Sequence, residues 1–93
     1  MFVGAIYIEL YLPSVNSLKD KRKIIKSILD RLRNRYNISV AEIDCQDVWQ
    51  KSTIGISYIN SKHSEIDIML ETILNFIKLE KDVSILDYEK YIY

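Results

Sequence analysis

FVGAIYIELYLPSVNSLKDKRKIIKSILDRLRNRY, residues 2–36, joins a strand pattern to a helix pattern in one run. Apolar residues recur at alternate positions as far as Pro13, which lacks an N–H and ends the strand. The face expected to be buried consists of Phe2, Gly4, Ile6, Ile8, Leu10 and Leu12. Ser17 is a good helix N-cap, and after it apolar residues repeat every three or four positions. The run therefore predicts a strand over 2–12 and an amphipathic helix over 17–36 that lies on one side of a sheet.

The rest of the chain predicts three further strands and a second helix. The strands are expected over 38–44, 50–60 and 83–92, and the helix over 61–80. In the strand over 38–44, Ile43 is out of phase with its apolar neighbours, which indicates a β-bulge. Asn37 tolerates left-handed backbone and is expected to close the first helix.

This order of elements predicts an α+β fold of the ferredoxin-like type, βαββαβ. Right-handed crossovers and short connections favour a four-stranded antiparallel sheet in the order 4-1-3-2, with both helices on one face. A chain of 93 residues suffices for one hydrophobic core. We therefore expect a single ferredoxin-like domain over 1–93.

The charges of this neutral chain are unevenly distributed. Residues 17–36 hold eight of the thirteen Lys and Arg but only two acidic residues, so the remainder is acidic. The single cysteine, Cys45, cannot form an internal disulfide, and one Cys with one His cannot build a zinc site. Residues 1–13 lack both a basic leader and the apolar run of about 20 residues that a membrane span needs. We expect a cytoplasmic protein without signal peptide or membrane anchor.

Four stretches carry a resemblance to a known family. They are MFVGAIYIELYLP (1–13), SLKDKRKIIKSILDRLRNRYNISVAEID (17–44), QDVWQKSTIGIS (46–57) and LDYEKYI (86–92). Together they resemble the YlxP-like family of small bacterial proteins, a family of unknown function. The resemblance implies a ferredoxin-like fold and a genomic setting beside translation factors and ribosome-binding factor A. It supplies no catalytic residues, and Cys45 stands where a polar residue such as Asp would be expected.

The first helix carries the candidate nucleic-acid-binding residues. Several of its cations are like-charged neighbours three or four residues apart, and the earliest of them lie at the positive end of the helix dipole. Local stability favours other residues there, so the charge points to a ligand such as nucleic-acid phosphate. The candidates are Lys19, Lys21, Arg22, Lys23, Lys26 and Arg33. The alternative is a solvated face, or cations paired with the acidic remainder of the chain.

The connection between the two central strands is a possible recognition loop. Its candidate residues are Asp44, Gln46, Asp47 and Trp49. Paired carboxylates can bind a cation, and a Trp can stack on a base. The alternative is a structural turn in which Asp favours the turn conformation and Trp49 covers an edge of the core.

The sheet face that points away from the helices is a candidate interface. Its exposed apolar residues are expected to be Val3, Tyr7, Tyr11 and Ile59. The third strand has no aromatic residue on this face, so base stacking as in RNA-recognition motifs is not expected. The face could form a homodimer or bind another protein. The alternative is an ordinary exposed antiparallel face.

Catalysis has little support in this sequence. Cys45 has no neighbouring His, His63 is expected at the surface, and two glycines cannot form a phosphate-binding loop. We therefore expect no enzymatic activity, no metal and no cofactor. The sequence favours a binding module for structured RNA or a ribosomal subunit that uses the first helix. The alternative is a protein-interaction module that uses the open sheet face and binds no nucleic acid.

Overall fold

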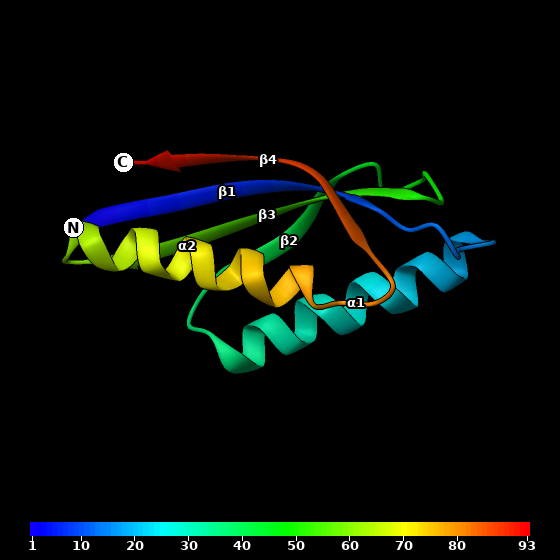
Figure 1. Cartoon of the computed structure of the whole chain (residues 1–93), viewed down its shortest axis with the longest axis horizontal. Helices are drawn as coiled ribbons and strands as arrows, with labels where there is room; N and C mark the ends of the chain where they lie inside the picture. Colours follow the sequence, from blue (N-terminus) through cyan, green and yellow to red (C-terminus); the bar gives the residue numbers. More distant parts are fainter.

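A four-stranded antiparallel sheet carries both helices on one of its faces (Figure 1). The computed structural model describes all residues from 1 to 93. Its elements are β1 (Phe2–Tyr11), α1 (Leu18–Arg35), β2 (Ser39–Asp44), β3 (Lys51–Asn60), α2 (His63–Lys78) and β4 (Ser84–Ile92). The strand order β2-β3-β1-β4 is the predicted order counted from the other edge, so the predicted βαββαβ fold is confirmed.

The ends of α1 have different causes. At its start the Ser17 hydroxyl accepts a hydrogen bond from the Asp20 N–H at 3.1 Å, as the N-cap pattern predicts. At its end the chain leaves the helix in extended backbone at Tyr36, and Asn37 does not adopt a left-handed conformation. That expectation was wrong. The one residue with positive φ is Cys45, at 61°, in the turn after β2.

Strand pairing determines which side chains share a face. β1 pairs with β3 without interruption, from Phe2 opposite Asn60 to Tyr11 opposite Lys51. The pairing of β2 with β3 shifts at Ile43, which confirms the predicted bulge. The register between β1 and β4 also shifts once, between Glu9 and Leu10. At this point β4 contains one extra residue.

The core lies between the sheet and the helices. Ile6, Ile8 and Leu10 of β1 are fully buried, so the predicted inner face of this strand is confirmed. Gly4 lies where α2 approaches most closely, because a Cβ at this position would lie 2.4 Å from the Ile66 Cγ2. The helices thus cover one face of the sheet and leave the other open.

Neither helix combines the length and the apolar character that crossing a membrane requires.

Candidate functional site

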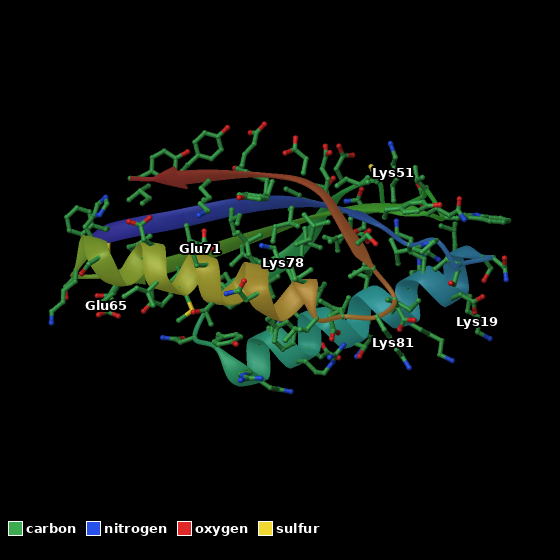
Figure 2. The ribbon with its side chains drawn as sticks, in the orientation of Figure 1. Lys19, Lys51, Glu65, Glu71, Lys78 and Lys81 are labelled. Carbon is green, nitrogen blue, oxygen red and sulfur yellow. The ribbon has the colours of Figure 1, made fainter.

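The outer side of α1 presents four of the predicted phosphate-binding residues to solvent. They are Lys19, Arg22, Lys23 and Lys26. Figure 2 shows Lys19 at the end of α1 and on the helix side of the molecule, whereas Lys51 lies on the open side of the sheet. This surface, defined by these four cations, is called the α1 ridge below.

The members of the α1 ridge differ in how well their charge is compensated. The Lys26 Nζ lies 2.6 Å from Asp30 Oδ2, and this hydrogen bond lowers the pKa of Asp30. The Arg22 Nη2 lies 3.7 Å from Asp47 Oδ1, beyond hydrogen-bond distance. Lys19 and Lys23 form no ion pair. The uncompensated charge is therefore concentrated in the first two turns of α1.

Arg33 has a structural role that its sequence position does not reveal. Its Nη2 donates to the Val40 carbonyl oxygen at 3.0 Å, and its Nη1 lies 3.2 Å from Asp30 Oδ1. The bond to Val40 ties the last turn of α1 to β2, and the contact with Asp30 lies within the helix. Arg33 therefore has less freedom to contact a ligand than the residues of the α1 ridge.

Lys21 is not a surface residue, and the expectation that it contacts phosphate was wrong. Its side chain is 0% exposed; the Nζ lies 3.0 Å from Glu42 Oε2 and donates to the Cys45 carbonyl oxygen. The same Glu42 oxygen accepts a hydrogen bond from the Ser52 hydroxyl at 2.6 Å. Lys21 is buried because it lies one helical turn before Ile25, on the apolar stripe of α1. The four-residue spacing from Lys21 to Ile25 is the sequence feature that could have predicted its burial.

The turn from Asp44 to Trp49 is organised by its own hydrogen bonds. The Asp44 Oδ1 accepts from the Cys45 N–H at 2.8 Å, and the Cys45 carbonyl accepts from the Val48 N–H at 3.1 Å. Gln46 and Asp47 are exposed, and no group of His, Cys, Asp or Glu side chains could hold a metal ion. Trp49 is 52% exposed, so it covers the core only partly. The turn is thus stabilised by its own hydrogen bonds, and its Cys45 carbonyl also accepts a hydrogen bond from Lys21.

The open sheet face has more aromatic surface than the sequence suggested. Tyr7 and Tyr11 of β1 are exposed on it, as is Ile59 of β3, with Val3 half-buried beside them. Because β4 pairs with β1, the register adds two further tyrosines to this face. Figure 2 shows side-chain rings standing above β4, on the side away from the helices.

These added tyrosines, Tyr91 and Tyr93, form a cluster with Tyr7. The Tyr7 and Tyr91 rings meet edge to face at 5.7 Å between centroids, and the Tyr91 and Tyr93 rings stack at 6.4 Å. The Tyr91 hydroxyl donates to Glu89 Oε2 at 2.5 Å, and this bond raises the pKa of Tyr91. Side chains alternate between the two faces along β4, so Tyr91 and Tyr93 share one face. This cluster could be predicted from that alternation once β4 is known to pair with β1.

Carboxylates occupy the next part of the open face along β1 and β4. Glu9 lies opposite Asp87, and Glu89 lies opposite Tyr7. Negative charge at these three positions repels phosphate, so this face is unsuited to a nucleic-acid backbone. The α1 ridge and the open face therefore have opposite electrostatic character.

A shallow hollow lies beside the tyrosine cluster. It has a volume of about 290 Å³, and small side chains from β1, β2 and β3 line it. These small residues are Ala5, Ser39, Ala41, Gly55 and Ser57. Ile43 borders the hollow, and a Cβ on Gly55 would lie 3.2 Å from two Ile43 carbons. The open face thus has a raised part on β4 and a lowered part over β2 and β3.

The sheet order, the two helices on one face and the split βαβ units define a ferredoxin-like α+β domain. Residues 3–90 match the family described as "Protein of unknown function (DUF503)". The chain belongs to this family.

A curated relative is "Uncharacterized protein YlxP" of Bacillus subtilis (strain 168). It is 36% identical over 75 residues, which are 81% of this chain and 82% of the relative. The resemblance to the YlxP-like family is thereby confirmed.

Two designed proteins resemble the chain in structure. One, described as the de novo designed protein Foldit4, has a TM-score of 0.53 and 19% identity, with 100% of this chain and 97% of that chain covered. The other, the de novo designed protein LFR1 1 with ferredoxin fold, has a TM-score of 0.55 and 11% identity, with 99% and 85% covered. At these identities the likeness shows the fold alone.

Proposed function

We propose that this protein is a cytoplasmic, non-enzymatic binding module that contacts the phosphates of structured RNA, such as ribosomal RNA, through the α1 ridge. The observation that carries the proposal is that Lys19 and Lys23 are exposed, lack ion-pair partners and begin a helix. Arg22 and Lys26 extend the same positive surface along α1.

Helix electrostatics make this arrangement unfavourable in the free protein. Lys19 and Lys23 are four residues apart, and such like-charged pairs cost about 0.2–0.5 kcal/mol. Each cation near a helix N-terminus costs about 0.3–1 kcal/mol at low salt. Phosphate groups placed along the ridge would offset both costs. A ligand therefore supplies the compensation that the fold provides to Lys21 and Arg33 but not to these residues.

The number of available cations determines the expected salt dependence. Each phosphate contact contributes about 0.7–0.9 to the slope of log affinity against log salt concentration. Four contacts give a slope between about −2.8 and −3.6. This value is smaller than six contacts would give, because Lys21 is buried and Arg33 is bonded to β2.

A fluorescence titration with a structured ribosomal RNA fragment between about 50 and 200 mM salt tests the proposal. The variant Lys19→Glu/Lys23→Glu should lose at least about tenfold in affinity and flatten the slope by about 1.4–1.8. The matched control Lys51→Glu/Lys62→Glu reverses two exposed cations elsewhere on the surface and should retain the slope. Absent binding at the lowest salt concentration, or equal losses in both variants, would contradict a role for the α1 ridge.

A further inference from the structure

The open sheet face is divided into two parts along its strands. The apolar part, here called the tyrosine face, consists of Val3, Ala5, Tyr7, Ile59, Tyr91 and Tyr93. Ile59 is 60% exposed and Tyr93 is 68% exposed, so this part holds the larger share of uncovered apolar surface. The facing carboxylates Glu9 and Asp87 mark its border along the strands, and Glu89, opposite Tyr7, marks its border on the edge strand β4. An occupant of the tyrosine face must therefore be apolar and stop before the acidic residues.

In two neighbouring rows of this face, large side chains lie on β4 or β1 and small ones lie on β3 and β2. Tyr91 on β4 lies in the same row as Ser57 on β3 and Ser39 on β2. In the next row, Tyr7 on β1 lies beside Gly55 on β3. In these two rows the face is therefore raised on the β4 and β1 side and lowered over β3 and β2, whereas in the Val3 row Ile59 makes β3 prominent as well.

A two-fold axis converts this asymmetry into self-complementarity. In the order β2-β3-β1-β4, an axis parallel to the strands and midway between β3 and β1 exchanges β1 with β3 and β4 with β2. Two sheets packed face to face about this axis place Tyr7 over the partner's Gly55. They also place Tyr91 over the partner's Ser39, so a raised part meets a lowered part in both rows.

We propose that the tyrosine face binds a second copy of this chain in this arrangement. Packed sheets lie about 10 Å apart and cross at about 30° because each sheet is twisted. In this arrangement Glu9 faces the partner's Thr53, the residue that pairs with it on β3, so the two Glu9 side chains do not meet. The Tyr91 hydroxyl already donates to Glu89, so the ring can be covered without an unpaired hydroxyl, while Glu89 on the edge strand β4 has to remain at the solvated rim.

The area of the face sets the expected strength of the dimer. The rows from Val3 to Tyr7 extend about 17 Å along β1, and four strands are about 19 Å wide. The footprint is therefore about 320 Å² per protomer and about 650 Å² for the pair, which is below the size of stable interfaces. We expect a weak dimer that dissociates at high micromolar concentration. The proposal is independent of the α1 ridge, which lies on the other side of the molecule.

Sedimentation equilibrium between about 5 and 500 µM tests the dimer. The average mass of the wild type should rise from 11.0 kDa toward twice that value. Ser57→Arg places a long cation in the hollow and should weaken association at least tenfold. The matched control Ser84→Arg changes an exposed residue beyond the acidic border and should leave association unchanged. A wild type that remains a monomer throughout this range, or equal effects of both variants, would overturn the proposal.

Cross-linking of engineered cysteines tests the axis and does not depend on the behaviour of Ser57→Arg. Ser39 and Tyr91 lie on strands at opposite edges of one sheet, about 14 Å apart, whereas the proposed packing brings Ser39 to about 10 Å from the partner's Tyr91. Both separations exceed the reach of a disulfide, so a short bis-maleimide reagent is used in place of oxidation. Ser39→Cys/Tyr91→Cys in a Cys45→Ser background should form linked dimers with this reagent, visible on a denaturing gel. The control Ser39→Cys/Ser84→Cys should form few. Equal trapping in both would overturn the proposed arrangement.

Discussion

The buried contact between Lys21 and Glu42 predicts an asymmetric response to mutation. Lys21 is fully buried, whereas the Glu42 side chain is 17% exposed and also accepts a hydrogen bond from Ser52. Removing Glu42 leaves an ammonium group without water or a counter-charge. Removing Lys21 leaves a carboxylate that still has a hydroxyl donor and some solvent. The Glu42→Leu variant should therefore be the less stable of the two.

The geometry sets the size of this difference. At 3.0 Å and an effective dielectric constant of about 20, the attraction between the two charges is about 5–6 kcal/mol before desolvation. Desolvation offsets most of it, so the pair contributes little net stability compared with apolar residues. Orphaning the buried Lys21 by Glu42→Leu should cost about 3–5 kcal/mol. Lys21→Met should cost about 1–3 kcal/mol, the range for an imperfectly satisfied polar group.

Urea unfolding followed by circular dichroism measures these free energies. For a domain of this size, 1 kcal/mol shifts the melting temperature by about 4–8 °C, so Glu42→Leu should melt at least about 12 °C lower. Lys23→Met is the matched control, since Lys23 is exposed and unpaired, and it should change stability by less than about 0.5 kcal/mol. The double variant Lys21→Met/Glu42→Leu should recover much of the loss, because no buried charge remains. Equal midpoints for Glu42→Leu and Lys23→Met would refute the reasoning.

Three further perturbations follow from the packing and ion pairs. Gly4→Ala forces a methyl group against Ile66 and should cost about 1–3 kcal/mol in urea unfolding; an unchanged midpoint would contradict the close approach of α2. A hydrogen bond from Lys90 lowers the pKa of Glu71, so this pair stabilises the fold at neutral pH and loses its effect as pH falls. Lys90→Met should return the pKa of Glu71 toward its ordinary 4.5, as NMR titration of the carboxyl group would show. Trp49→Ala should cost less than about 1.5 kcal/mol by thermal unfolding, since a fully buried aromatic costs about 3–5 and Trp49 is 52% exposed.

The elements were predictable because each has one clear period. β1 alternates without interruption, α1 has a cap and a stripe, and the phase error at Ile43 corresponds to a real bulge. Lys21 was misassigned because its residue type suggested the surface while its spacing placed it on the stripe. The left-handed residue is Cys45 rather than Asn37; it lies in the turn after β2, and its carbonyl accepts hydrogen bonds from Lys21 and from the Val48 N–H.

The candidate surfaces were less predictable because they depend on contacts between distant segments. The face on which Tyr91 and Tyr93 lie follows from the pairing of β4 with β1, and an extra residue in β4 changes its phase. Arg33 is not a free cation, because it donates a hydrogen bond to the Val40 carbonyl. No local sequence pattern encodes this contact. Sequence periodicity thus determines which side chains point inward, and strand neighbours determine which exposed side chains meet.

The two proposed surfaces are compatible because they lie on opposite sides of one layer. Pairing through the tyrosine faces leaves both helix layers outermost, and each α1 ridge stays accessible (Figure 1). With about 10 Å between the sheets and about 10 Å from each sheet to its helices, the two α1 helices lie about 30 Å apart. One stretch of RNA backbone cannot neutralise both ridges at that separation. A dimer therefore gains affinity only from an RNA with two well-separated phosphate segments, while the salt dependence of each single contact surface remains that of the monomer.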